Sequence, residues 1–133
     1  MQGSRVQRVA LDRALALPGA TLEWPFGPDW DVVKVRGKVF LLMAELRGQP
    51  IVILKADPVD ARLLCQDLAE VTPGYHMNKR HWITLSPGPG LDEALVQDLV
   101  TDSYLLVVAG LPRAQQPVDP ERFGLGSAAP PDE

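Results

Sequence analysis

The chain has 133 residues, of which 46% are hydrophobic and 23% are charged, and its formal net charge at pH 7 is −4. This composition predicts one soluble globular domain, and no apolar run approaches the roughly 18 residues that a membrane-spanning helix needs. The negative charge excludes attraction of the whole surface to nucleic acid, but a local basic patch remains possible. Because Cys65 is the only cysteine and no signal peptide is visible, we expect a cytoplasmic bacterial protein without disulfides.

The first predicted element is a helix from residue 4 to about residue 17. Apolar residues recur there at helical spacing, and Ser4 followed by Gln7 has the spacing of a capping box. Pro18 removes an amide donor and Gly19 favours a left-handed cap, so the helix is expected to end at this point. A short strand is predicted next, over residues 20–26.

Two aromatic residues, Trp24 and Phe26, stand among prolines and a glycine in residues 24–28. Proline fixes φ and interrupts strand pairing, so the segment predicts a rigid corner. We expect both rings to pack inward, and the alternative is that they form the wall of a pocket.

Residues 30–46 predict a β-hairpin. If Gly37 and Lys38 are the central turn residues, the glycine supplies the positive φ of a type II′ turn. That register places four apolar side chains on one core face and puts Lys34 and Arg36 on the other. A turn at Arg36 and Gly37 is the alternative, but it places Lys38 beside the valines, so the first register is preferred. The four apolar residues are Val33, Val35, Phe40 and Leu42.

The second half of the chain is predicted from helix and strand signals. A strand over residues 50–55 precedes a helix that begins at Asp57 and Pro58, because aspartate caps free amides and proline fits the first helical turn. A strand over residues 82–86 and a helix from residue 91 to about residue 100 follow, with further helix from Asp102. These elements predict an α+β fold with two layers, in which an antiparallel sheet of about five strands has helices packed on one face.

The domain is expected to span residues 1–113. Residues 114–133 are rich in Pro, Ala and Gly, and Phe123 and Leu125 are their only sizeable apolar side chains. We expect this tail to be flexible, because it has few groups to bury.

The chemistry of the chain is concentrated in residues 73–82. This stretch holds both histidines, His76 and His81, with aromatic residues and an adjacent Lys-Arg pair, and it leads into a strand. Two interpretations of its aromatic rings remain open, since they either stack on a ligand or fill the core beneath solvated cations. The remaining members of the group are Tyr75, Lys79, Arg80 and Trp82.

With these motifs placed, the chain resembles the MmcQ/YjbR family. The resemblance rests on residues 24–27, the hairpin over residues 34–40, Leu54-Lys55, residues 75–82 and residues 102–104, and it spans about residues 4–113. It implies a small α+β domain with a CyaY-like or secretion-chaperone-like sheet. It also implies a double-wing DNA-binding motif, in which the hairpin is a wing.

Metal and catalytic chemistry are not favoured by the motifs. His76 and His81 are five residues apart with no carboxylate between them, and Lys79 and Arg80 would repel a bound cation. No nucleophile motif of the G-x-S-x-G type and no phosphate-loop lysine is present. We therefore expect no catalytic residue, no metal and no cofactor.

Two binding functions remain. The first is DNA or other nucleic-acid binding through hairpin cations and the aromatic and basic stretch, comprising Lys34, Arg36, Lys38, Tyr75, His76, Lys79, Arg80, His81 and Trp82. The alternative is a protein partner on the open sheet face, for which Leu41 and Ile53 are candidate exposed positions. No membrane interaction is expected.

Overall fold

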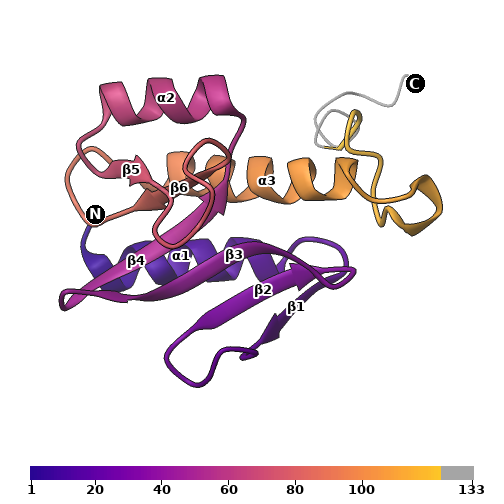
Figure 1. The fold of residues 1–133 in the computed structure, drawn as a ribbon, viewed down its shortest axis with the longest axis horizontal. Helices are drawn as coiled ribbons and strands as arrows, with labels where there is room; N and C mark the ends of the chain where they lie inside the picture. The colour runs from indigo at the N-terminus through magenta and orange to yellow at the C-terminus, as the bar shows by residue number, and fades with distance from the viewer. Residues whose placement is uncertain (124–133) are drawn as a thin grey trace.

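The structure is a computed structural model, and it describes residues 1–123. Three helices and a six-stranded antiparallel sheet follow one another along the chain, and the strands lie in the order β1-β2-β3-β4-β6-β5 (Figure 1). The elements are α1 (Gly3–Leu15), β1 (Ala20–Glu23), β2 (Asp31–Val35), β3 (Lys38–Leu46), β4 (Gln49–Lys55), α2 (Pro58–Asp67), β5 (Val71–Pro73), β6 (Trp82–Leu85) and α3 (Glu93–Ala109), with a 3₁₀ turn at Arg113–Gln115.

The main core lies between the sheet and the pair α1 and α3, which pack against each other behind β3 and β4 (Figure 1). Tyr104 of α3 sits at its centre, with its ring edge-on to Phe40 at a centroid distance of 5.3 Å. Its hydroxyl donates a hydrogen bond to the Pro18 carbonyl at 2.6 Å. The predicted α+β class is confirmed, and β5 adds a sixth strand outside β6.

A second, smaller core covers the opposite face of the sheet. Val32, Leu42, Ile51 and Ile53 are almost fully buried there, beneath side chains from residues 74–82. The expectation that Leu41 and Ile53 are exposed is therefore wrong, since both have 0% exposure. The continuous apolar runs of β3 and β4 are typical of strands buried on both faces.

The hairpin adopts the register that the sequence analysis rejected. Arg36 and Gly37 form the turn with φ of 52° and 79°, and Val35 pairs with Lys38. A β-bulge then shifts the pairing, so that Lys34 faces Val39 while Val33 faces Leu41. Phe40 is the extra residue of the bulge and Leu41 stands opposite Val33, so both reach the main core. Leu42 was predicted on the same core face, but it pairs with Val32 and lies in the core on the other side of the sheet.

Ser103 closes the gap that this bulge opens. Its hydroxyl donates to the Phe40 carbonyl at 2.6 Å and accepts from the Lys55 amide at 2.9 Å. The side chain is fully buried, so it satisfies two backbone groups from which water is excluded.

Helix ends agree with the sequence analysis in one place and differ in two. Asp57 caps α2 by accepting from the Val59 and Asp60 amides, as expected. The capping box at Ser4 is wrong, because α1 begins at Gly3 and its cap residue, Gln2, makes no side-chain hydrogen bond. The last helix is a single α3 that runs through the expected break.

The aromatic corner also differs from its prediction. Trp24 and Phe26 are 53% and 63% exposed, so neither ring packs inward. The Trp24 indole donates to the Asp31 carboxylate at 2.8 Å, which ties the corner to the start of β2.

Residues 114–123 contact the domain, although the sequence analysis expected no packed structure for them. Val118 and Phe123 pack against the main core, and the Phe123 ring lies 6.2 Å from that of Tyr104. The Arg36 guanidinium donates to the Gln115 carbonyl at 3.0 Å. Leu125 and the rest of the predicted tail lie outside the described residues.

Candidate nucleic-acid interface

The loop of residues 74–81 crosses the second face of the sheet, and its base is held by close backbone contacts. The Gly74 amide donates to the Trp82 carbonyl at 2.8 Å, and the Tyr75 amide donates to the Thr84 hydroxyl at 2.9 Å. A Cβ on Gly74 would lie only 2.5 Å from the Trp82 Cβ, so no other residue fits there without a shift. These contacts fix the direction in which the loop leaves the sheet.

Hydrogen bonds inside the loop order its polar tip. The Asn78 carboxamide accepts from the Arg80 amide at 2.9 Å, and the Lys79 amine donates to the Gly74 carbonyl at 2.6 Å. His76 has a positive φ of 61°, which few residues other than glycine adopt. The side chains of His76, Lys79, Arg80 and His81 are all exposed.

The aromatic rings combine the two interpretations that the sequence left open. Tyr75 and Trp82 are half-buried, because each packs against the second core while part of its ring remains accessible. The Tyr75 and His76 rings lie against each other with centroids 4.0 Å apart. The Lys55 amine stands over the Trp82 ring, 5.4 Å from its centroid, in the range of a cation–π contact.

Lys79 and Arg80 line a cavity of about 390 Å³ against α2, and Arg62 joins them from that helix. The lining contains three cations and no carboxylate, with Pro58, Pro73, Ala61, Ile83, Cys65 and Gln66 as the other walls. Burial raises the pKa of the Cys65 thiol. The cavity is therefore a local positive site on a chain of negative net charge.

The hairpin cations are held apart from this cavity. Lys34 forms an ion pair with Glu23 at 3.3 Å, and the Thr21 hydroxyl and Lys34 together lower the pKa of that carboxyl. Arg36 is bound to the Gln115 carbonyl, while Lys38 is exposed at the start of β3. In the strand order, Lys55 on β4 stands between this hairpin and Trp82 on β6.

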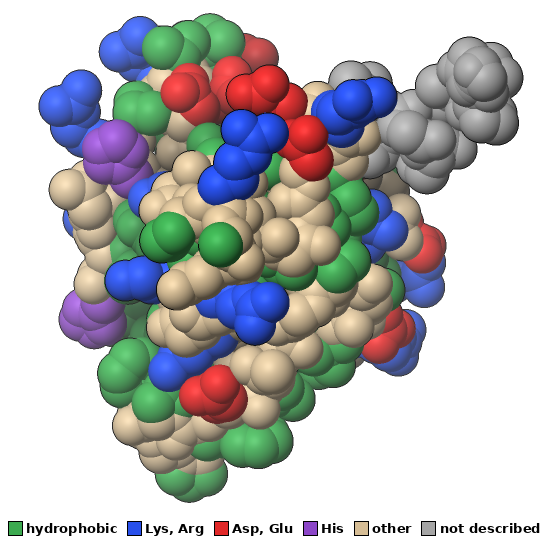
Figure 2. All heavy atoms as spheres, turned by 90° about the vertical axis from the view of Figure 1, so that its right-hand side faces the viewer, with side chains coloured by type: hydrophobic (Ala, Val, Ile, Leu, Met, Phe, Trp, Pro, Cys, Tyr) green, Lys and Arg blue, Asp and Glu red, His purple; other side chains and the backbone are tan. Residues whose placement is uncertain are grey.

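Figure 2 shows both histidines along one edge of the molecule, with Lys or Arg side chains beside them. Acidic side chains gather in a different region near the top of that view. The structure thus brings Tyr75, His76, Lys79, Arg80, His81 and Trp82 together, and it separates Lys34, Arg36 and Lys38 from them.

Lys55 and Arg62 were missed by the sequence analysis. The strand and the helix that carry them were predicted, but no local signal shows that residues 74–82 return against both elements. Within residues 1–123, no group of three or more His, Cys, Asp or Glu side chains is placed to hold a metal ion.

The sequence profile of the YjbR family matches residues 15–106. The chain belongs to the YjbR family. It is 47% identical over 116 residues to the uncharacterized protein YbdF of Escherichia coli O157:H7, covering 87% of this chain and 95% of the relative. It is 34% identical over 108 residues to the uncharacterized protein YjbR of Escherichia coli K12, covering 80% and 90% of the two chains. The family resemblance drawn from the sequence is therefore confirmed.

Two solved structures of other bacterial proteins have a similar fold. A crystal structure of a Deinococcus radiodurans protein aligns with a TM-score of 0.72 at 28% identity, covering 95% of this chain and 89% of the other. A Pseudomonas syringae protein at 24% identity shares the fold alone, with a TM-score of 0.62 over 77% of this chain and 97% of its own. Among the described residues of this YjbR protein, no helix has both the length and the apolar character to cross a membrane.

Proposed function

We propose that this YjbR protein is a non-catalytic nucleic-acid-binding domain that contacts single-stranded segments. The interface is the loop surface, defined as residues 74–81 with Lys55, Arg62 and Trp82. The observation that carries the proposal is the convergence of exposed cations and half-exposed rings in one loop fixed on the sheet. Proteins that bind single strands combine cations, which follow the nucleic-acid backbone, with aromatic rings, on which the bases stack.

Single strands fit this surface better than a duplex held by the hairpin wing. A wing contacts mainly phosphate, and it needs free cations to do so. Here the carboxylate of Glu23 compensates Lys34, which leaves the wing fewer cations for phosphate. The Tyr75 and His76 rings, in contrast, offer stacking area that bases paired inside a duplex do not use.

The cavity between α2 and the loop supplies a place for a phosphate group. Its three cations have no carboxylate among the lining residues, so a phosphate would be stabilised without displacing an existing ion pair. Such a contact attracts nucleic acid locally, even though the net charge of the chain is −4.

The test is a titration of labelled single-stranded and duplex oligonucleotides at about 50 and 200 mM salt. The double variant Lys79→Ala, Arg80→Ala should bind single strands more weakly and lower the salt slope by about 1.4, since each phosphate contact contributes about 0.7. The matched control is Arg8→Ala, Arg122→Ala, which removes the same charge from exposed positions outside the loop surface. It should leave affinity and slope close to those of the wild type.

Two results would contradict this function. If the wild type binds neither oligonucleotide below ~100 μM at low salt, it lacks the usual nonspecific affinity of nucleic-acid-binding proteins. If both double variants lose the same affinity, binding follows overall charge and does not use the loop surface. Melting curves of each variant show whether a lost contact reflects loss of the fold, because Lys79 also bonds to Gly74.

A further inference from the structure

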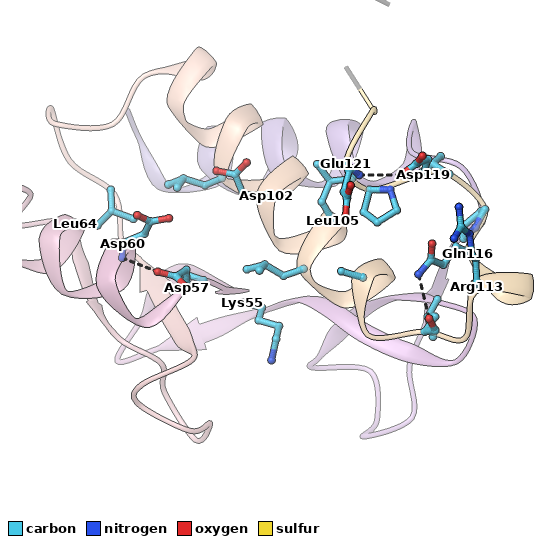
Figure 3. A pocket seen from close by; sticks show the side chains of 18 residues that line it. Lys55, Asp57, Asp60, Leu64, Asp102, Leu105, Arg113, Gln116, Asp119 and Glu121 are labelled. Carbon is cyan, nitrogen blue, oxygen red and sulfur yellow. Dashed lines mark hydrogen bonds between the residues drawn. The ribbon is translucent and has the colours of Figure 1, made fainter. Parts of the chain in front are cut away.

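A groove of about 960 Å³ runs between α2, α3 and residues 113–121 (Figure 3). Its apolar lining comes from α3, from Leu64 of α2 and from the C-terminal segment, which contributes Val118. Leu105, Leu106 and Val118 are half-buried, so their side chains remain partly accessible in the groove. The groove shares only Lys55 with the loop surface. It borders the side of α2 that carries Asp60, whereas Arg62 borders the basic cavity.

The charged lining of the groove is predominantly acidic. Five carboxylates and two cations contribute to it, from Asp57, Asp60, Asp102, Asp119, Glu121, Lys55 and Arg113. Within residues 1–123 none of the five carboxylates forms an ion pair, since both ion pairs found there involve glutamates outside the groove. In Figure 3 the Lys55 amine points away from the acidic side chains, so it does not neutralise them.

The carboxylates of the groove also act on one another. Partial burial raises the pKa of the Asp102 carboxyl, and the neighbouring charges of Asp98 and Asp60 raise it further. A cation placed between α2 and α3 would relieve this repulsion.

The outer face of α2 extends the accessible apolar surface. Val59 and Leu63 are one helical turn apart and are 53% and 49% exposed. Leu63 follows Asp60 by three residues, so apolar and acidic side chains alternate along this side of the helix.

We propose that this groove docks a cationic amphipathic segment of a partner protein. The apolar residues of such a segment would cover Leu64, Leu105 and Leu106, and its Lys or Arg side chains would meet the acidic rim. This is the arrangement of an amphipathic helix in a hydrophobic groove. Residues 124–133 of the chain itself do not match it, because they contain two carboxylates and no Lys or Arg.

The probe is a fluorescent peptide with Leu at helical i, i+3, i+4 spacing and Lys between them, compared with a scrambled peptide of the same composition. We expect the patterned peptide to bind the wild type several times more tightly than the scrambled one. The variant Asp60→Asn, Asp102→Asn should weaken its binding about tenfold, the scale of a lost charge-assisted contact. The matched control, Asp12→Asn, Glu45→Gln, removes two exposed carboxylates outside the groove lining and should change the affinity less than twofold.

A variant in the apolar lining of the groove tests the contribution of apolar contact separately from that of charge. Leu106→Ser should also weaken the patterned peptide severalfold, while its melting temperature is recorded to show that the fold is retained. The proposal is overturned if the control pair weakens binding as much as the groove pair, or if the scrambled peptide binds equally well. It is also overturned if Leu106→Ser has no effect, because a small polycation would then suffice. None of these variants alters a residue of the loop surface, so none of them should weaken oligonucleotide binding.

Discussion

Replacing Ser103 by alanine should destabilise the protein more than the removal of a single hydroxyl group suggests. The hydroxyl is fully buried and bridges the Phe40 carbonyl and the Lys55 amide at 2.6 and 2.9 Å. Alanine leaves both groups without a partner beside the β-bulge. An unsatisfied buried polar group costs about 1–3 kcal/mol, and the two groups share one site, so we expect a loss of about 2–4 kcal/mol.

The loss is measured by urea unfolding, with an unchanged m value confirming that the same surface is exposed. Ser86→Ala is the control, because that half-buried side chain makes no hydrogen bond among the described residues, and it should change stability by less than about 0.5 kcal/mol. If Ser103→Ala also falls below about 0.5 kcal/mol, the bulge obtains its hydrogen bonds from another source and the bridging role is refuted.

Four further changes test other contacts. Gly74→Ala should cost about 1–3 kcal/mol in urea unfolding, because its Cβ would lie 2.5 Å from the Trp82 Cβ, and an unchanged midpoint would contradict the close approach. Phe123→Ala should cost about 1–2 kcal/mol, less than a fully buried ring, and a loss near zero would support the tail expected from sequence. Asp102→Asn should raise the melting temperature at pH 7, since the raised pKa makes the carboxylate charge unfavourable in the folded state, and this gain should vanish below about pH 4. His76→Asn keeps the positive φ accessible but removes the ring, so single-strand affinity should fall about fivefold or more, whereas an unchanged affinity would remove His76 from the interface.

The hairpin shows how far a local pattern predicts structure. Its existence followed from alternating valines and a glycine, but the register did not, because the sequence analysis assumed regular pairing. With regular pairing, a turn at Arg36 and Gly37 places Lys38 on the core face. In the structure Lys38 does stand opposite Val35, but it is exposed at the end of the strand, and the bulge at Phe40 then brings Leu41 opposite Val33. The Phe40 carbonyl in this bulge is bound by Ser103, which is 63 residues away in the chain. A tertiary contact of this range leaves no signal in the strand itself.

The candidate site was predicted in composition but not in arrangement. Residues 75–82 were identified because rings and cations are concentrated there, and they do lie together. The hairpin cations were grouped with them by the wing motif, yet the strand order places β2 and β6 on opposite sides of β3 and β4. The residues that complete the loop surface, Lys55 and Arg62, come from elements whose side chains gave no functional signal on their own.

Helix α2 connects the two proposals, because its two sides border sites of opposite charge. Asp57, Asp60 and Leu64 line the acidic groove, whereas Arg62 and Cys65 line the basic cavity. A cationic segment in the groove and a phosphate in the cavity would each be attracted by the nearer side of the helix and repelled by the other side.

If both sites are occupied, a cation in the groove also reduces the negative potential felt by a nucleic acid across α2. Peptide bound in the groove should therefore strengthen oligonucleotide binding modestly, and by linkage the oligonucleotide should strengthen peptide binding by the same factor. The coupling should fade as salt rises, because the two sites interact through solvent-exposed charges.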